Sequence, residues 1–99
     1  MTLNEVKEYL KLDDDLIEDD ELIKGLIIAA KTYIEDSTGK VYQDSELYNL
    51  AVMMVVAHWY ENRSIIHNKT VVNELPQSFF AIVAQIQWSN RYKEVVRHG

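Results

Sequence analysis

The sequence has 99 residues, of which 47% are hydrophobic and 26% charged; this is the size and balance of one folded domain and excludes a disordered chain. The absence of cysteine excludes disulfides, thiolate metal sites and a cysteine nucleophile, and three glycines with one proline are too few for the many tight turns of an all-β protein. The net charge of −6 makes the chain a poor binder of nucleic-acid phosphates.

The opening segment predicts a short helix over about residues 3–11. Thr2 followed three residues later by Glu5 is a capping box, and Leu3 begins an apolar face that returns at helical spacing. The segment lacks the basic start and apolar stretch of a secretory signal, and the longest unbroken apolar run, residues 50–57, is too short to span a bilayer. We therefore expect an intracellular, soluble protein.

A second helix begins at the end of the acid-rich stretch of residues 13–21. Asp19 or Asp20 is placed to cap this helix, which is expected to run to about Asp36, and Gly39 supplies a left-handed stop beyond it. Apolar residues at three- and four-residue spacing form one broad stripe along it: Leu22, Ile23, Leu26, Ile27, Ala30, Tyr33 and Ile34.

A third helix is expected to open at Asp44 or Ser45. From residue 47 to residue 60 nearly every position is apolar. A helix that is apolar all round is enclosed by other helices or by another subunit, so we predict that this is the central helix.

The last third of the chain predicts a loop, a helix and a tail. Residues 64–74 lose the helical period and gather β-branched residues, which favours an extended loop or a short hairpin. Pro76 suits the first position of a last helix that runs to about Trp88 on a stripe of Phe79, Ile82, Val83 and Ile86. Residues 89–99 form either a last helical turn or a C-terminal arm. The whole chain, residues 1–99, is therefore predicted to be an all-α, single-domain bundle of about four helices.

The charge is divided unevenly along the chain. Residues 1–49 hold thirteen acidic and five basic residues, a net charge of −8, whereas residues 50–99 hold three acidic and five basic residues, a net charge of +2. Copies polarised in this way can stack head to tail, and such contacts close into rings. The alternative is solvated charge without a partner, and for the acids of residues 13–21 a solvated, helix-capping cluster.

No pattern of residues supports catalysis or a cofactor. The acids of residues 13–21 do not have the spacing of a calcium loop, and His58, His67 and His98 lack the one-turn spacing of paired metal ligands. No serine lies in a glycine-flanked nucleophile turn, and no glycine-rich loop is present to cradle phosphate. We expect no enzyme, cofactor or metal; the weakest alternative is a metal-dependent hydrolase built on His58 and Glu61.

Several motifs lie in order along the chain: Leu3-x-x-Val6-Lys7-x-x-Leu10, Leu26-Ile27-x-Ala29-Ala30-x-x-Tyr33-Ile34, Thr38-Gly39-Lys40, Ala57-His58-Trp59-Tyr60-Glu61-Asn62-Arg63 and Leu75-Pro76. Together with the acid-rich link they resemble the small head-tail connector (adaptor) family of tailed bacteriophages and prophages. The resemblance covers about residues 3–88, and its most specific piece is the Tyr60 to Arg63 motif followed by Leu75-Pro76.

The resemblance implies an all-α subunit that joins copies of itself into a ring beneath the portal and extends the DNA channel. The implied partners are other copies of the chain, the portal protein and a tail-completion protein, with DNA as non-specific cargo and neither a membrane nor a small-molecule substrate. The implied location is the head-tail interface of the virion, and the host cytoplasm before assembly. By this analogy residues 64–74 face a neighbour or the tail side, and the C-terminal arm reaches the portal.

The candidate subunit or partner contacts are Tyr60, Glu61, Arg63, Ile65, Ile66, Val71, Val72, Arg91 and Tyr92. Arg63 is expected to pair with an acid of residues 13–21 or with one from a neighbour. The apolar side chains of residues 64–74 either dock a partner or fold back onto the core, and the basic tail is either disordered or ordered by a partner. The rival function is a small helical regulatory module of a bacterial cell that binds another protein through this loop.

Overall fold

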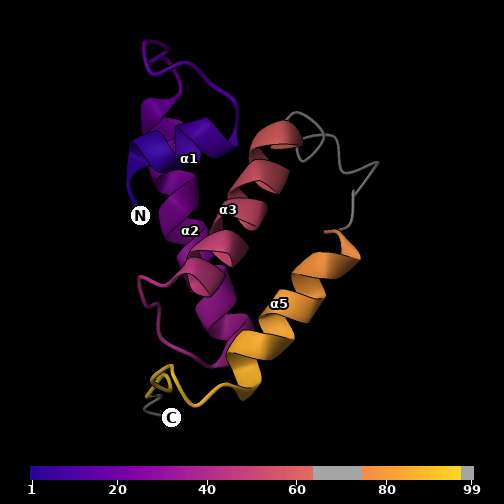
Figure 1. Ribbon diagram of the computed structural model, residues 1–99. Helices are drawn as coiled ribbons and strands as arrows, with labels where there is room; N and C mark the ends of the chain where they lie inside the picture. The colour runs from indigo at the N-terminus through magenta and orange to yellow at the C-terminus, as the bar shows by residue number, and fades with distance from the viewer. Residues whose placement is uncertain (64–74, 97–99) are drawn as a thin grey trace.

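The computed structural model describes residues 1–63 and 75–96, and four helices run through this part of the chain. Their bounds are Leu3–Tyr9 for α1, Asp20–Thr38 for α2, Glu46–Glu61 for α3 and Gln77–Trp88 for α5. Neighbouring helices α2 and α3 run in opposite directions, α5 packs against both, and α1 lies near the start of α2 (Figure 1). The predicted all-α bundle is confirmed, while the loop predicted over residues 64–74 lies outside the described residues.

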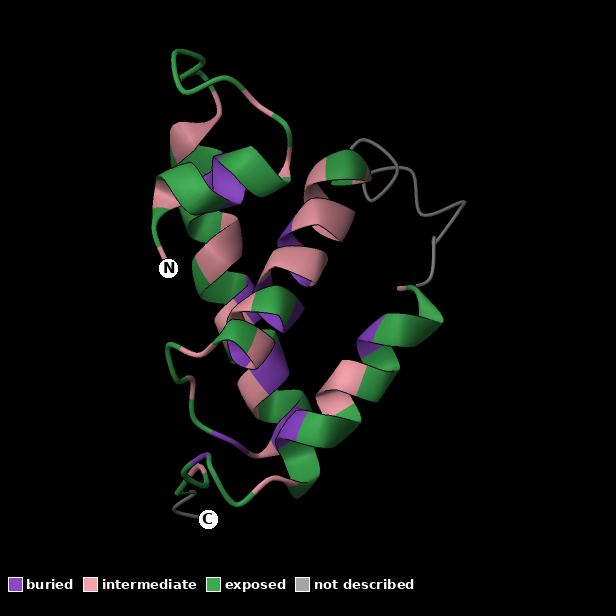
Figure 2. Ribbon diagram, in the orientation of Figure 1, coloured by how far each residue is buried: buried purple, intermediate pink, exposed green. Residues whose placement is uncertain are grey.

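The hydrophobic core lies where α2, α3 and α5 meet. Its fully buried helical residues are Val6 on α1, Ile23, Ala30 and Ile34 on α2, Tyr48, Ala51, Val52, Val55 and Val56 on α3, and Phe79 and Ile86 on α5. They form the purple faces turned toward the centre in Figure 2. Because α3 packs against α1, α2 and α5, it needs apolar residues on most of its surface. The prediction that this is the central helix is therefore confirmed.

Two of the predicted helix starts are capped by side chains. Thr2 Oγ1 accepts the N–H of Glu5 at 3.2 Å, and Ser45 Oγ accepts the N–H of Tyr48 at 3.2 Å. Asp19 occupies the predicted N-cap position of α2, but its side chain makes no cap hydrogen bond. The prediction of a carboxylate cap there is wrong, because that carboxylate is engaged by α3, as described below.

The end of α2 predicted from Gly39 and the start of α5 predicted from Pro76 both fall within two residues of the observed positions. Gly39 is left-handed with φ of 72°, and its N–H donates to Glu35 O at 2.8 Å, so α2 reaches Thr38 rather than Asp36. Pro76 has an extended ψ of 155° and is the N-cap of α5, where the sequence predicted the first helical residue.

The C-terminal segment, residues 89–96, is not a last helical turn. It folds back along residues 39–41, where Val41 N–H donates to Lys93 O at 2.7 Å and Val95 N–H donates to Gly39 O at 2.8 Å. The described part of the predicted arm therefore lies on its own chain.

Tyr92 anchors this segment in the core. Its side chain is 5% exposed, its ring meets that of Tyr48 edge to face at 5.6 Å, and its hydroxyl lies 2.9 Å from Ser45 Oγ. The segment after the last helix therefore completes the core between α2 and α3.

Candidate interaction surfaces

The carboxyl end of α3 is tied to the start of α2 through Tyr60 and Asp19. Tyr60 Oη donates to Asp19 Oδ2 at 2.5 Å, and Arg63 Nη2 lies 4.0 Å from the same oxygen. The Arg63 guanidinium also stacks over the Tyr60 ring at 4.2 Å from its centroid. The predicted pairing of Arg63 with an acid of residues 13–21 thus occurs within the chain, but both partners are substantially exposed and the pair adds little stability.

The hydrogen bond from Tyr60 to Asp19 has an electrostatic consequence. This bond, assisted by burial and by the carboxylate charge, raises the pKa of the Tyr60 hydroxyl above its ordinary value. Through the same hydrogen bond, the Tyr60 to Arg63 motif, which carries the most specific part of the family resemblance, joins the end of α3 to the start of α2 inside one copy of the chain.

A buried lysine organises the acidic loop, which we define as residues 13–19. The Lys7 side chain is 1% exposed, and its Nζ donates to Asp14 O at 3.1 Å and to Leu16 O at 2.6 Å. The same ammonium lies 3.0 Å from Asp20 Oδ1. An ammonium is buried at tolerable cost only when it is paired and hydrogen-bonded. The two carbonyl oxygens therefore hold the loop to α1, and the Asp20 carboxylate joins α1 to the start of α2.

The acidic loop presents exposed apolar side chains between its carboxylates. Ile17 is 69% exposed and Leu16 about half exposed, and Figure 2 shows most of the loop as exposed. Beside it lies a hollow of about 340 Å³ lined by Asn4, Glu5, Glu8, Leu12, Asp13 and Asp14. We call the loop and this hollow the acidic end of the molecule.

A cleft of about 320 Å³ lies between residues 41–43 and the C-terminal segment. Its lining residues are Val41, Tyr42, Gln43, Arg91 and Lys93. Arg91 and Lys93 are exposed, and neither forms an ion pair with any residue of 1–63 or 75–96. The nearby Glu94 carboxylate lies 3.5 Å from Lys40 Nζ, so its charge is compensated locally.

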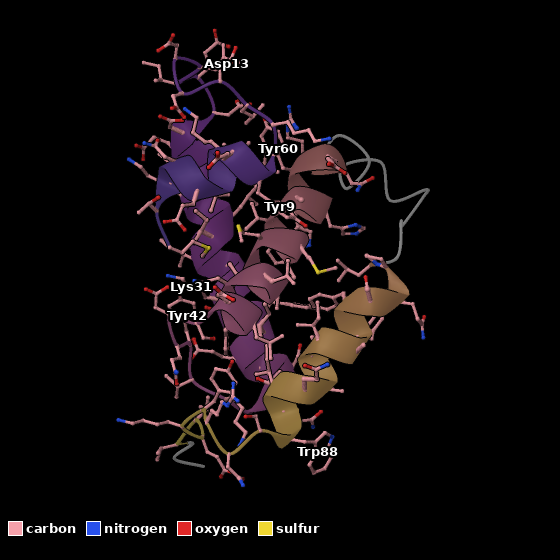
Figure 3. The ribbon with its side chains drawn as sticks, in the orientation of Figure 1. Tyr9, Asp13, Lys31, Tyr42, Tyr60 and Trp88 are labelled. Carbon is pink, nitrogen blue, oxygen red and sulfur yellow. The ribbon has the colours of Figure 1, made fainter. Side chains whose placement is uncertain are left out.

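One wall of this cleft is fixed by Tyr42. Its hydroxyl donates to Asn49 Oδ1 at 2.5 Å, and Lys31 Nζ lies over its ring at 4.2 Å from the centroid. Both side chains are labelled in Figure 3 and lie in the same region of the molecule. Burial, followed by the charge of Asp44, raises the pKa of the Tyr42 hydroxyl. We call this cleft, together with the exposed Trp88 at the end of α5 and the exposed Val96 of the C-terminal segment, the basic end.

The two side chains suggested for a hydrolase line a separate groove. It has a volume of about 430 Å³ and is lined by Tyr9, Lys11, Met54, Ala57, His58, Glu61 and Pro76. A catalytic metal needs about three protein ligands, and within residues 1–63 and 75–96 no three His, Cys, Asp or Glu side chains are grouped to hold one. Among the described residues, the groove therefore brings His58 and Glu61 together without the further ligand that this alternative requires.

The structure places the described candidate contact residues in four different parts of the molecule. Tyr60 and Arg63 join α3 to α2, Glu61 lines the groove, and Arg91 is exposed at the basic end. Tyr92 belongs to the core and presents little surface to a partner. Ile65, Ile66, Val71 and Val72 lie outside the described residues.

Sequence reasoning gave no role to Lys7 or to the exposed Ile17. Lys7 follows Leu3 by four residues and precedes Leu10 by three, so helical spacing already placed this lysine on the apolar face of α1. A lysine in that position needs oxygen partners, which is the signal that was available. The outward direction of Ile17 had no such signal, since loops have no regular period.

The comparisons with known proteins agree with the fold and the motifs. A model of the family described as phage gp6-like head-tail connector protein matches residues 1–87 of the 99-residue chain. This match includes α1, α2, α3 and all but the last residue of α5, and ends before the C-terminal segment. Comparison with curated proteins and with solved structures gives no match. None of the helices described in residues 1–63 and 75–96 is long and apolar enough to cross a membrane.

Proposed function

Since residues 1–87 match its model, the chain belongs to the phage gp6-like head-tail connector protein family, and we propose that it forms a ring of identical subunits on the portal. In this assembly the ring extends the channel for DNA and offers a platform to a tail-completion protein. The family is structural and non-enzymatic, so the chain acts in the virion by contacts with phage head and tail proteins.

The distribution of charge over the molecule supports a ring. The acidic loop and the C-terminal segment lie at opposite ends of the view in Figure 1, with the helices between them. A contact between two different surfaces of one subunit is heterologous, and repetition of such a contact closes into a ring when the rotation allows. Surfaces of opposite sign at the two ends favour this arrangement over a symmetric dimer.

The overall acidity supports the role as a conduit. A net charge of −6 per subunit repels DNA phosphates, and the repulsion grows with the number of subunits around a channel. DNA that is not bound by the wall passes freely, which is what a connector between head and tail requires.

The direct test is assembly on the portal of the same phage. Purified portal rings mixed with excess chain should carry an additional coaxial ring in negative-stain electron microscopy, whereas portal alone and chain alone give the two reference images. Failure of the chain to join portal rings, even at high excess, would contradict the proposal.

A genetic test separates the connector from the rival regulatory module. A phage that lacks this chain should accumulate DNA-filled heads without tails, and the chain supplied from a plasmid should restore tailed particles. Normal tailed particles in its absence would show that the chain is not a structural part of the head-tail junction.

A further inference from the structure

The acidic end and the basic end of the molecule carry charged side chains of opposite sign that form no ion pairs within the described residues of the chain. At the acidic end, Asp13 and Asp14 form no side-chain ion pair with any residue in the described ranges. At the basic end the same holds for Arg91 and Lys93. Each end thus presents uncompensated charge, and the two signs are opposite.

Each end also presents exposed apolar side chains, which lie in the segment that carries its charges or directly precede that segment in the sequence. Ile17 at the acidic end is 69% exposed, and at the basic end Trp88 is 80% exposed and Val96 is 77% exposed. Exposed apolar side chains in or directly beside a segment that carries unpaired charge are typical of a surface that meets another protein.

Hydrogen bonds within the chain order the backbone of the acidic end before it binds a partner. The hydrogen bonds from the buried Lys7 ammonium to two loop carbonyls, Asp14 O and Leu16 O, fix the backbone that presents Ile17. A surface that is ordered before it binds loses less conformational entropy on association. At the basic end, the backbone hydrogen bonds of Val41 and Val95 order the C-terminal segment in the same way.

We propose that the acidic end of one copy docks on the basic end of the next, with Asp13 and Asp14 facing Arg91 and Lys93 and with Ile17 covered by apolar residues of the neighbour. This inference rests on the proposed function, because it names the contact that repeats around the ring. A second copy is the partner that fits, because the chain alone carries both complementary surfaces and carries them at opposite ends (Figures 1 and 3).

Charge exchange between the two ends tests this contact. The double variant Asp13→Lys/Asp14→Lys has two basic ends, and the double variant Arg91→Glu/Lys93→Glu has two acidic ends. Each variant alone should self-associate at least about tenfold more weakly than the native chain, because like charges then meet. An equimolar mixture of the two should associate again, because every contact in an alternating assembly joins opposite charges. The quadruple variant should recover in the same way.

Sedimentation equilibrium up to about 1 mM, where contacts of millimolar affinity are measurable, gives the association constants at low and high ionic strength. Lys93→Glu tests the contact with a single charge reversal, and Lys24→Glu is its matched control. Both substitutions change the net charge equally, but Lys24 lies outside both the acidic end and the basic end. Only Lys93→Glu should weaken association. Circular dichroism and the thermal midpoint establish that each variant is folded.

Two results of the association measurements would overturn the contact. One is a mixture of the two double variants that associates no better than either alone; the other is equal weakening by Lys24→Glu and Lys93→Glu. Portal binding is scored separately: if both double variants join portal rings as the native chain does, the contact is wrong while the proposed function stands. If the mixture associates but the native chain never joins the portal, the contact stands and the proposed function fails.

Discussion

Lys7 is the side chain on which the acidic loop depends. Its ammonium is almost fully buried, and the oxygens around it come from Asp14, Leu16 and Asp20. Two of the three are backbone carbonyls of the loop, so the charge stabilises a particular loop conformation as well as the Asp20 carboxylate. The loop therefore combines a solvated outer surface with an ordered inner side.

Replacement of Lys7 by methionine tests this dependence. Lys7→Met keeps most of the side-chain volume but leaves the Asp20 carboxylate and two carbonyls without their cation, so the free energy of unfolding should fall by about 3 kcal/mol. Urea unfolding followed by circular dichroism measures the change. The control is Lys24→Met, whose exposed pair with Glu21 contributes well under about 1 kcal/mol. Equal effects of the two substitutions would show that the Lys7 contacts do not stabilise the fold.

The bond between Tyr60 and Asp19 predicts a specific dependence on pH. Because the pKa of Tyr60 is raised in the folded state, the stabilisation is complete below the ordinary tyrosine pKa of about 10 and is lost as the pH rises through the higher folded value. Asp19→Asn should lower the pKa of Tyr60 toward its ordinary value. Ultraviolet titration of tyrosinate, with Tyr60→Phe subtracted to isolate this residue, measures the shift. An unchanged Tyr60 titration in Asp19→Asn would mean that the hydrogen bond is absent in solution.

Among the helices, α2 offers two glycines with opposite roles. Gly25 lies inside the helix, whereas Gly39 ends it in the left-handed conformation, and a Cβ added at either position would meet nothing within 4 Å. Gly39→Ala should therefore cost about 1 kcal/mol of unfolding free energy through backbone strain alone. Gly25→Ala should instead raise the free energy of unfolding by about 0.5–1 kcal/mol, because alanine lowers the conformational entropy of the unfolded chain. Thermal and urea unfolding of the two variants provide the check, and a destabilising Gly25→Ala would contradict this account of α2.

The helices were predictable because their signals are local. The capping residues Thr2 and Ser45, the stop at Gly39 and the apolar stripes lie within the segments that they define. The hydrogen-bond partner of the Asp19 carboxylate was not predicted correctly. The Tyr60 hydroxyl, 41 residues away, binds this carboxylate in place of the backbone N–H groups at the start of α2. Local pattern gives the choice of element, but it does not give the partner of a side chain that two elements compete for.

At the scale of the whole folded chain, the feature that the sequence predicted least is the path of the C-terminal segment, which packs against residues 39–41. Its residues show neither helical nor alternating periodicity, and the interaction that fixes it joins Tyr92 to Ser45, 47 positions apart. The family match ends at residue 87, and the resemblance implied only an arm that reaches the portal, without the packing of this segment on its own chain. The segment nevertheless closes the core beside Tyr48 and carries the cations of the basic end.

Tyr92 therefore links the stability of the fold to the surface proposed for assembly. Tyr92→Ala removes a ring that is 5% exposed and should cost about 3 kcal/mol, whereas Val96→Ala, at a side chain that is 77% exposed, should cost less than about 0.5 kcal/mol. In Tyr92→Ala the amide of Val41, which donates to Lys93 O, should also exchange with solvent faster, because the segment that accepts its hydrogen bond has lost its anchor. Urea unfolding and hydrogen exchange measured by NMR test the two effects together. Undiminished protection of Val41 in Tyr92→Ala would show that the backbone pairing holds the segment without its aromatic anchor, and that the basic end is ordered independently of the core.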